Sequence, residues 1–99
     1  MSLVPMQQEE AQDTWHSLAN GVVKYTKQGR LVVVSVTNAS TATSATLPEG
    51  YRPPDAIRAV GWGNSGGTSM GIIAVQSTGV MGFGPSGAAV YGSFVFATD

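Results

Sequence analysis

Turn signals recur along this chain about every eight to twelve residues, and this spacing restricts its possible folds more than any other feature. Short apolar stretches lie between turns rich in glycine, asparagine and proline, from Asn20-Gly21 to Gly84-Pro85-Ser86-Gly87. No stretch of useful length repeats its apolar residues with the helical period of 3.6. The sequence therefore predicts an all-β domain, a compact antiparallel β-sandwich or barrel of about seven strands.

The expected strands cover residues 21–27, 30–37, 43–47, 56–62, 68–75, 80–83 and 88–97. The second of them carries apolar side chains on both faces, with Val32, Val34 and Val36 on one and Leu31 and Val33 on the other. We therefore expect this strand to be central and covered on both sides.

Composition excludes several classes of function. Only 11% of the residues are charged and the net charge is −1, so the chain has no basic field for nucleic acid. With no cysteine and one histidine, it offers neither disulfides nor a recognisable metal site, and we expect no cofactor. The longest apolar runs are far shorter than the ~20 residues of a membrane-spanning helix, so we expect no membrane insertion.

The same composition favours self-association. A domain near this size buries only ~60–65% of the surface that its unfolded chain exposes, so its core is thin. A surface so poor in charge does not easily keep a lone monomer in solution. We therefore expect a component of a larger particle.

Residues 1–13 are polar and acidic, unlike the rest of the chain. We expect them to form a flexible leader or the stump of a fibre shaft, with Met1-Ser2-Leu3 as a vector-derived start. The domain itself is expected to cover residues 14–99.

Three motifs follow one another in order. They are W-x-x-L-x-N-G from Trp15, Y-x-K-x-G-x-(V/L)-V from Tyr25, and T-L-P-x-G-Y-R-P from Thr46. Their order and spacing resemble those of the C-terminal head domains of bacteriophage tail-fibre and baseplate receptor-binding proteins. The resemblance covers residues 15 to 60, and beyond them it extends only as a pattern of strands.

The resemblance implies a homotrimeric head at the tip of a virion or of a prophage-encoded particle. Such a head binds host cell-wall or cell-surface polysaccharide and contacts other tail or baseplate proteins. Two alternatives stay open: a purely structural baseplate or fibre module that docks another tail protein, and a tail-associated glycan hydrolase.

The resemblance also implies structural roles for the motif residues, namely Trp15, Leu18, Leu47, Tyr51 and Arg52. We expect Trp15 and Leu18 to plug one end of the barrel. Tyr51 is expected to pack beneath the proline loop, residues 48–54, in which Arg52 bonds to backbone carbonyls.

Catalysis has little support in the sequence. Glu49 and Asp55 flank the proline loop, and as a glycosidase pair they would need to lie ~5–9 Å apart, one of them in an apolar pocket. No sequence feature places them so. His16 has no recognisable serine or aspartate partner motif, and we do not expect an enzyme.

Saccharide binding has better candidates, because aromatic rings pack on the apolar face of a sugar ring while polar side chains bond to its hydroxyl groups. In a regular strand over 56–62, side chains two apart share a face. The tentative binding residues are Asp55, Arg58, Trp62, Asn64 and Tyr91. An alternative stays open in which Trp62 belongs to the core and Arg58 pairs with a carboxylate across a subunit contact.

Overall fold

The computed structural model describes residues 14–64 and 69–98, which form eight strands and one short 3-10 helix. The expected leader at residues 1–13 lies outside the described residues, as do residues 65–68 of the glycine-rich loop after Trp62. The elements are β1 (His16–Leu18), η1 (Ala19–Gly21), β2 (Val23–Gln28), β3 (Leu31–Ala39), β4 (Ala45–Thr46), β5 (Ile57–Trp62), β6 (Met70–Val75), β7 (Val80–Gly84) and β8 (Val90–Ala97).

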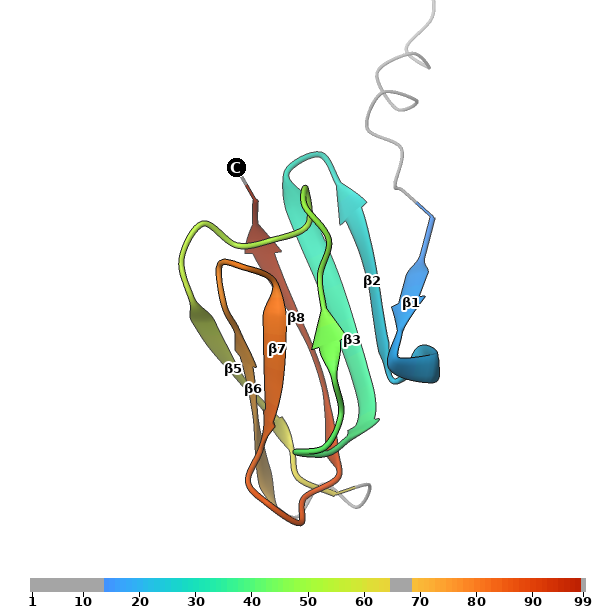
Figure 1. Cartoon of the computed structure of the whole chain (residues 1–99), viewed down its shortest axis with the longest axis vertical. Coiled ribbons are helices and arrows are strands. Elements are labelled where there is room, and N and C mark those ends of the chain that lie inside the picture. Colours follow the sequence, from blue (N-terminus) through green and yellow to red (C-terminus); the bar gives the residue numbers. More distant parts are fainter. Residues whose placement is uncertain (1–13, 65–68, 99) are drawn as a thin grey trace, which may run out of the picture.

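The strands form one continuous sheet in the order β1-β2-β3-β8-β5-β6-β7-β4, and every neighbouring pair is antiparallel (Figure 1). Strand β8 pairs with β3 along most of its length but with β5 only where Tyr91 lies opposite Trp62. The sheet therefore folds at this point into two halves, β1-β2-β3-β8 and β5-β6-β7-β4. This arrangement confirms the predicted all-β antiparallel sandwich or barrel.

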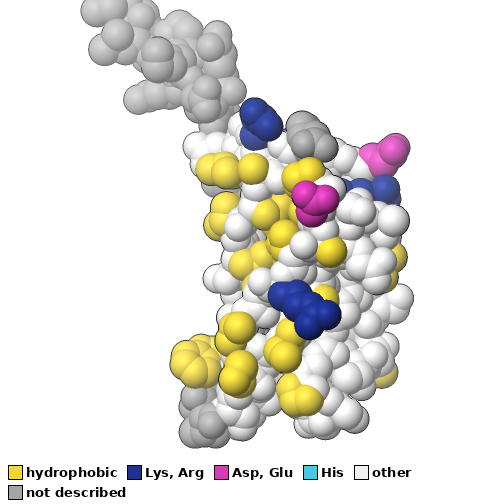
Figure 2. Space-filling view, turned by 90° about the vertical axis from the view of Figure 1, so that its left-hand side faces the viewer, with side chains coloured by type: hydrophobic (Ala, Val, Ile, Leu, Met, Phe, Trp, Pro, Cys, Tyr) yellow, Lys and Arg dark blue, Asp and Glu magenta, His cyan; other side chains and the backbone are white. Residues whose placement is uncertain are grey.

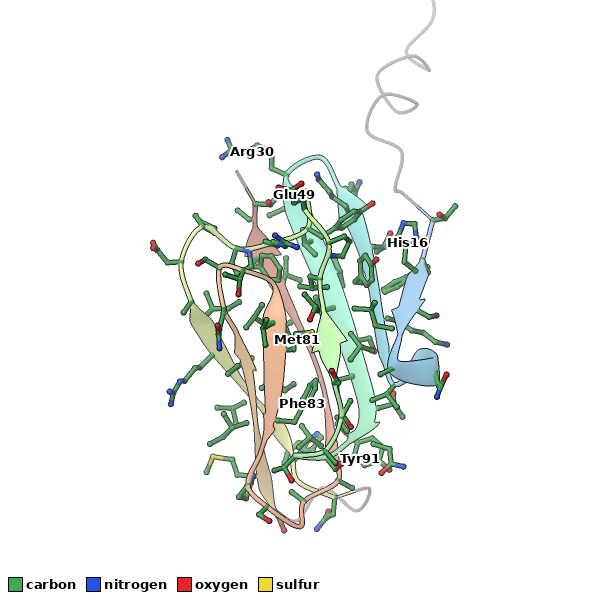
Figure 3. The ribbon with its side chains drawn as sticks, in the orientation of Figure 1. His16, Arg30, Glu49, Met81, Phe83 and Tyr91 are labelled. Carbon is green, nitrogen blue, oxygen red and sulfur yellow. The ribbon has the colours of Figure 1, made fainter. Side chains whose placement is uncertain are left out.

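The core lies between the two halves and draws side chains from both. Val32 and Val34 of β3 are fully buried, and they belong to one apolar cluster with Ile73 of β6 and with Met81 and Phe83 of β7. Figure 3 shows Met81 and Phe83 directed into the space between the sheet halves. Burial alternates along these strands because successive side chains point to opposite faces.

The prediction that β3 is covered on both faces is wrong. The strand is central, between β2 and β8, but Leu31 is 51% exposed while Val33 and Ser35 are only partly buried. The sheet folds into two layers with one core between them, so a strand faces the core on one side only. In β3 that side carries Val32, Val34 and Val36, which belong to the core cluster.

Two glycines allow the close approach of β5 and β8 at the fold in the sheet. A Cβ atom added to Gly61 would collide with the carbonyl oxygen of Tyr91, and one added to Gly92 would lie 3.2 Å from Cα of Gly61. Larger residues would force the strands apart at the point where the sheet changes direction. The close approach of β5 to β8 positions Trp62 beside β8 and near β3.

Candidate saccharide-binding site

The outer face of β5 carries Arg58, Val60 and Trp62, as the alternation of side chains predicts. Val60 is 71% exposed and Trp62 is 57% exposed. The alternative in which Trp62 is a core residue is therefore wrong. Its indole ring projects from the end of a regular strand and is accessible to a ligand.

Beside Trp62 lies an open hollow of about 490 Å³, within the range of small-molecule sites. It is lined by Ser35, Val36, Val60, Gly61, Trp62, Gly92 and Ser93. The lining thus combines the Trp62 ring and the exposed Val60 side chain with two serine hydroxyls, each of which can donate and accept hydrogen bonds. Ser35 and Ser93 lie directly opposite each other on β3 and β8.

Of the residues expected to bind saccharide, only Trp62 lines this hollow. Arg58 lies farther along the same face of β5, and Asp55 is exposed in the loop before that strand. Asn64 Nδ2 donates a hydrogen bond to Ser69 Oγ at 3.1 Å. Tyr91 is half-buried opposite Trp62 in the strand register.

Sequence reasoning missed both serines of the hollow. They are 58 residues apart in the chain and meet only because β3 and β8 are neighbours in this register. The alternation of side chains within each strand places both serines on the outer face. However, no local sequence pattern indicates that β3 pairs with β8. The site could therefore not be assembled from motifs.

A second hollow, of about 410 Å³, adjoins the first and is lined by Trp15, Lys24 and Ser35. Trp15 is 52% exposed, so it does not plug an end of the barrel as expected. It precedes β1, which lies at the edge of the sheet, and the two-layered fold has no closed end there for a ring to fill. Leu18 is partly buried and packs against the core cluster.

Tyr51 holds the first and third motifs together. Its ring centroid lies 5.0 Å from that of Tyr25 and 5.7 Å from that of His16, both in edge-on geometry. The Tyr51 hydroxyl lies 3.4 Å from His16 Nε2, and Lys27 Nζ lies 5.3 Å from the Tyr51 ring centroid. His16 of β1 is thus part of an aromatic cluster with Tyr25 of β2 and Tyr51 of the loop after β4.

The proline loop is fixed by backbone contacts of the kind expected for Arg52. Arg52 Nε donates to the carbonyl oxygen of Leu47 at 2.7 Å, and Leu47 itself is fully buried. Thr98 Oγ1 in turn donates to the carbonyl oxygen of Arg52 at 2.7 Å. The loop is therefore tied to the end of β8.

Glu49 and Asp55 are both exposed. Neither carboxyl group lies in the apolar pocket that the general acid of a glycosidase pair occupies. Glu49 lies at the opposite end of the sandwich from Tyr91, and so from the hollow beside Trp62 (Figure 3). Within residues 14–64 and 69–98, no group of three histidine, cysteine or acidic residues could hold a metal ion.

An apolar patch lies next to the hollow on the outer face of β5 and β6. Val60 lies opposite Ile72 and Trp62 opposite Met70 in the register. Met70 is 61% exposed and Ile72 is 40% exposed. Figure 2 shows the side of the molecule that carries β5, where hydrophobic side chains extend from the upper to the lower part and the acidic ones lie in the upper part.

No protein-family model, curated protein or solved structure matches this chain. In the part of the chain that the structure describes, no helix is long and apolar enough to cross a membrane.

Proposed function

We propose that this chain is the receptor-binding head of a phage tail fibre or baseplate, and that it recognises a host cell-surface saccharide. One observation carries the binding part of the proposal: Trp62 is exposed over a hollow that contains two serine hydroxyls. The indole ring offers a flat apolar surface for the C–H face of a sugar, and the hydroxyls offer partners for the sugar's own hydroxyl groups.

The phage assignment is supported by the three motifs and by how their residues meet. Tyr25 of the second motif and Tyr51 of the third pack on each other and on His16 within the first. Motifs that are distant in sequence thus contribute to one structural cluster, which gives their order and spacing a physical reason. The proposal places the protein at the tip of a phage tail or of a prophage-encoded particle, in contact with other tail or baseplate proteins.

We propose a homotrimer as the working form. The outer face of β5 and β6 exposes Val60, Met70 and Ile72 in a chain with few charges, and contiguous exposed apolar side chains commonly mark protein interfaces. Three copies of a weak saccharide site would also raise avidity without a new contact.

The proposal is tested with a glycan array that includes purified bacterial cell-wall polysaccharides, probed with the assembled protein. We expect binding to at least one of these glycans and loss of that binding in Trp62→Ala. An assembled protein that binds none of the printed glycans would contradict the proposal.

A structural module that docks another tail protein is the second candidate, and the apolar patch on β5 and β6 favours it. This candidate predicts no glycan binding by the wild-type protein. It also predicts that Ile72→Lys, in the middle of the patch, prevents incorporation into particles. Glycan binding by the wild-type protein would argue against it.

A further inference from the structure

A row of polar side chains crosses four strands on the outer face of the sheet. The register places Ser17 of β1 opposite Lys24 of β2, Lys24 opposite Ser35 of β3, and Ser35 opposite Ser93 of β8. Ser17, Lys24 and Ser93 are exposed, and Ser35 is partly exposed. With neighbouring strands ~4.8 Å apart, the row is roughly 14 Å long.

A tryptophan flanks each part of this row. Trp62 and Ser93 line the first hollow, whereas Trp15 and Lys24 line the second, and Ser35 lines both. The two hollows therefore adjoin at Ser35. Together they form one track, with an exposed aromatic ring in each part and hydroxyl or ammonium groups along it.

The chemistry of this track suits an extended glycan better than a single sugar. Each aromatic ring can pack on one sugar unit, and the serines and Lys24 can bond to the hydroxyl groups of the units between. Among the described residues, the charged side chain that lines the two hollows is Lys24, whose ammonium group can donate hydrogen bonds to sugar hydroxyl groups. A ligand that occupied the first hollow alone would leave Trp15 and Lys24 unused.

We infer that the track binds a linear oligosaccharide across both hollows, with Trp15 as a second stacking platform. This inference rests on the proposed saccharide-binding function. It assigns Trp15, Lys24 and Ser17 to the ligand site, and it predicts that affinity depends on chain length.

The test uses printed series of linear glucose, N-acetylglucosamine and galactose oligomers, together with length-graded fragments of any polysaccharide that the protein binds. For the preferred series, oligomers long enough to span both hollows should bind at least about tenfold more tightly than the shortest ligand, a gain of about 1.4 kcal/mol. Trp15→Ala should remove this gain and leave binding of the shortest ligand unchanged. Trp15→Phe, which keeps a ring, should retain most of it.

Leu31→Ala is the matched control, because Leu31 is 51% exposed on the same face of the sheet but lies outside the polar row. It should keep the full dependence on chain length. Thermal melts of all variants show whether a loss of binding reflects a loss of folding.

A second measurement needs no truncation of Trp15. The chain has two tryptophans, so Trp62→Phe leaves Trp15 as the sole indole fluorophore. Long oligomers of the preferred series should shift its emission, and the shortest ligand should not.

The outcomes separate the two claims. Equal affinity for short and long oligomers, or a length gain that survives in Trp15→Ala, would overturn the extended track and leave saccharide binding at Trp62 standing. A wild-type protein that binds no glycan of any length would contradict the proposed function, and the track with it.

Discussion

Gly61 shows how a single residue determines the position of the candidate site. Its missing side chain lets β5 lie directly against the backbone of Tyr91, where the sheet folds. Any side chain there would push β5 away from β8. Trp62 is the next residue, so the distance between its ring and Ser93 depends on this contact.

Gly61→Ala is therefore expected to lower the free energy of unfolding by about 1–3 kcal/mol, the usual cost of overpacking. Gly82→Ala is the control, because a Cβ atom at Gly82 meets no atom within 4 Å, and we expect it to be neutral or slightly stabilising. Urea denaturation of both variants measures the difference. Equal midpoints would show that the β5–β8 contact is not tight.

At the scale of elements, the outer face of β5 and β6 is the surface that we propose for the subunit contact. Ile72 lies at its middle, opposite Val60. Ile72→Lys should weaken the trimer, because burial of an unpaired ammonium group at an apolar contact is costly. Val80→Lys makes the same kind of change at similar exposure, 42% against 40%, on the neighbouring strand β7.

Sedimentation at several protein concentrations should show dissociation of Ile72→Lys but not of Val80→Lys. If both variants sediment like the wild-type protein, the subunit contact lies elsewhere.

Some of the strands and their arrangement could be predicted from the sequence, and others could not. Turn spacing and alternation predicted the all-β class and the position of β3 within the sheet. They missed β1, because three residues are too few for an alternating pattern to be recognised. The polar row from Ser17 to Ser93 depends on three strand registers, and no local pattern encodes them.

The burial of the two tryptophans could not be predicted from the sequence either. Trp15 was expected to plug one end of the barrel, and Trp62 was left open to an interpretation as a core residue. Both are more than half exposed. A two-layered sheet of this size has one core-facing side per strand, and the strand period alone does not say which side that is.

At the scale of the whole molecule, the proposed trimer rests on the chemistry of the surface. One thin core and few charges leave apolar side chains exposed on the single chain. We expect light scattering at micromolar concentration to give about three times the chain mass of 10.2 kDa. A mass equal to one chain would contradict the trimer.

The most direct test of saccharide recognition compares Trp62→Ala with Val95→Ala on the same glycan and by the same thermal melt. The two side chains are 57% and 56% exposed, and Val95 lies on the outer face of β8 two residues beyond Ser93. We expect Trp62→Ala to weaken binding by on the order of 2 kcal/mol or more, as for a central aromatic contact. Both variants should melt close to the wild type, since neither side chain is buried. Unchanged glycan binding by a folded Trp62→Ala would contradict the account.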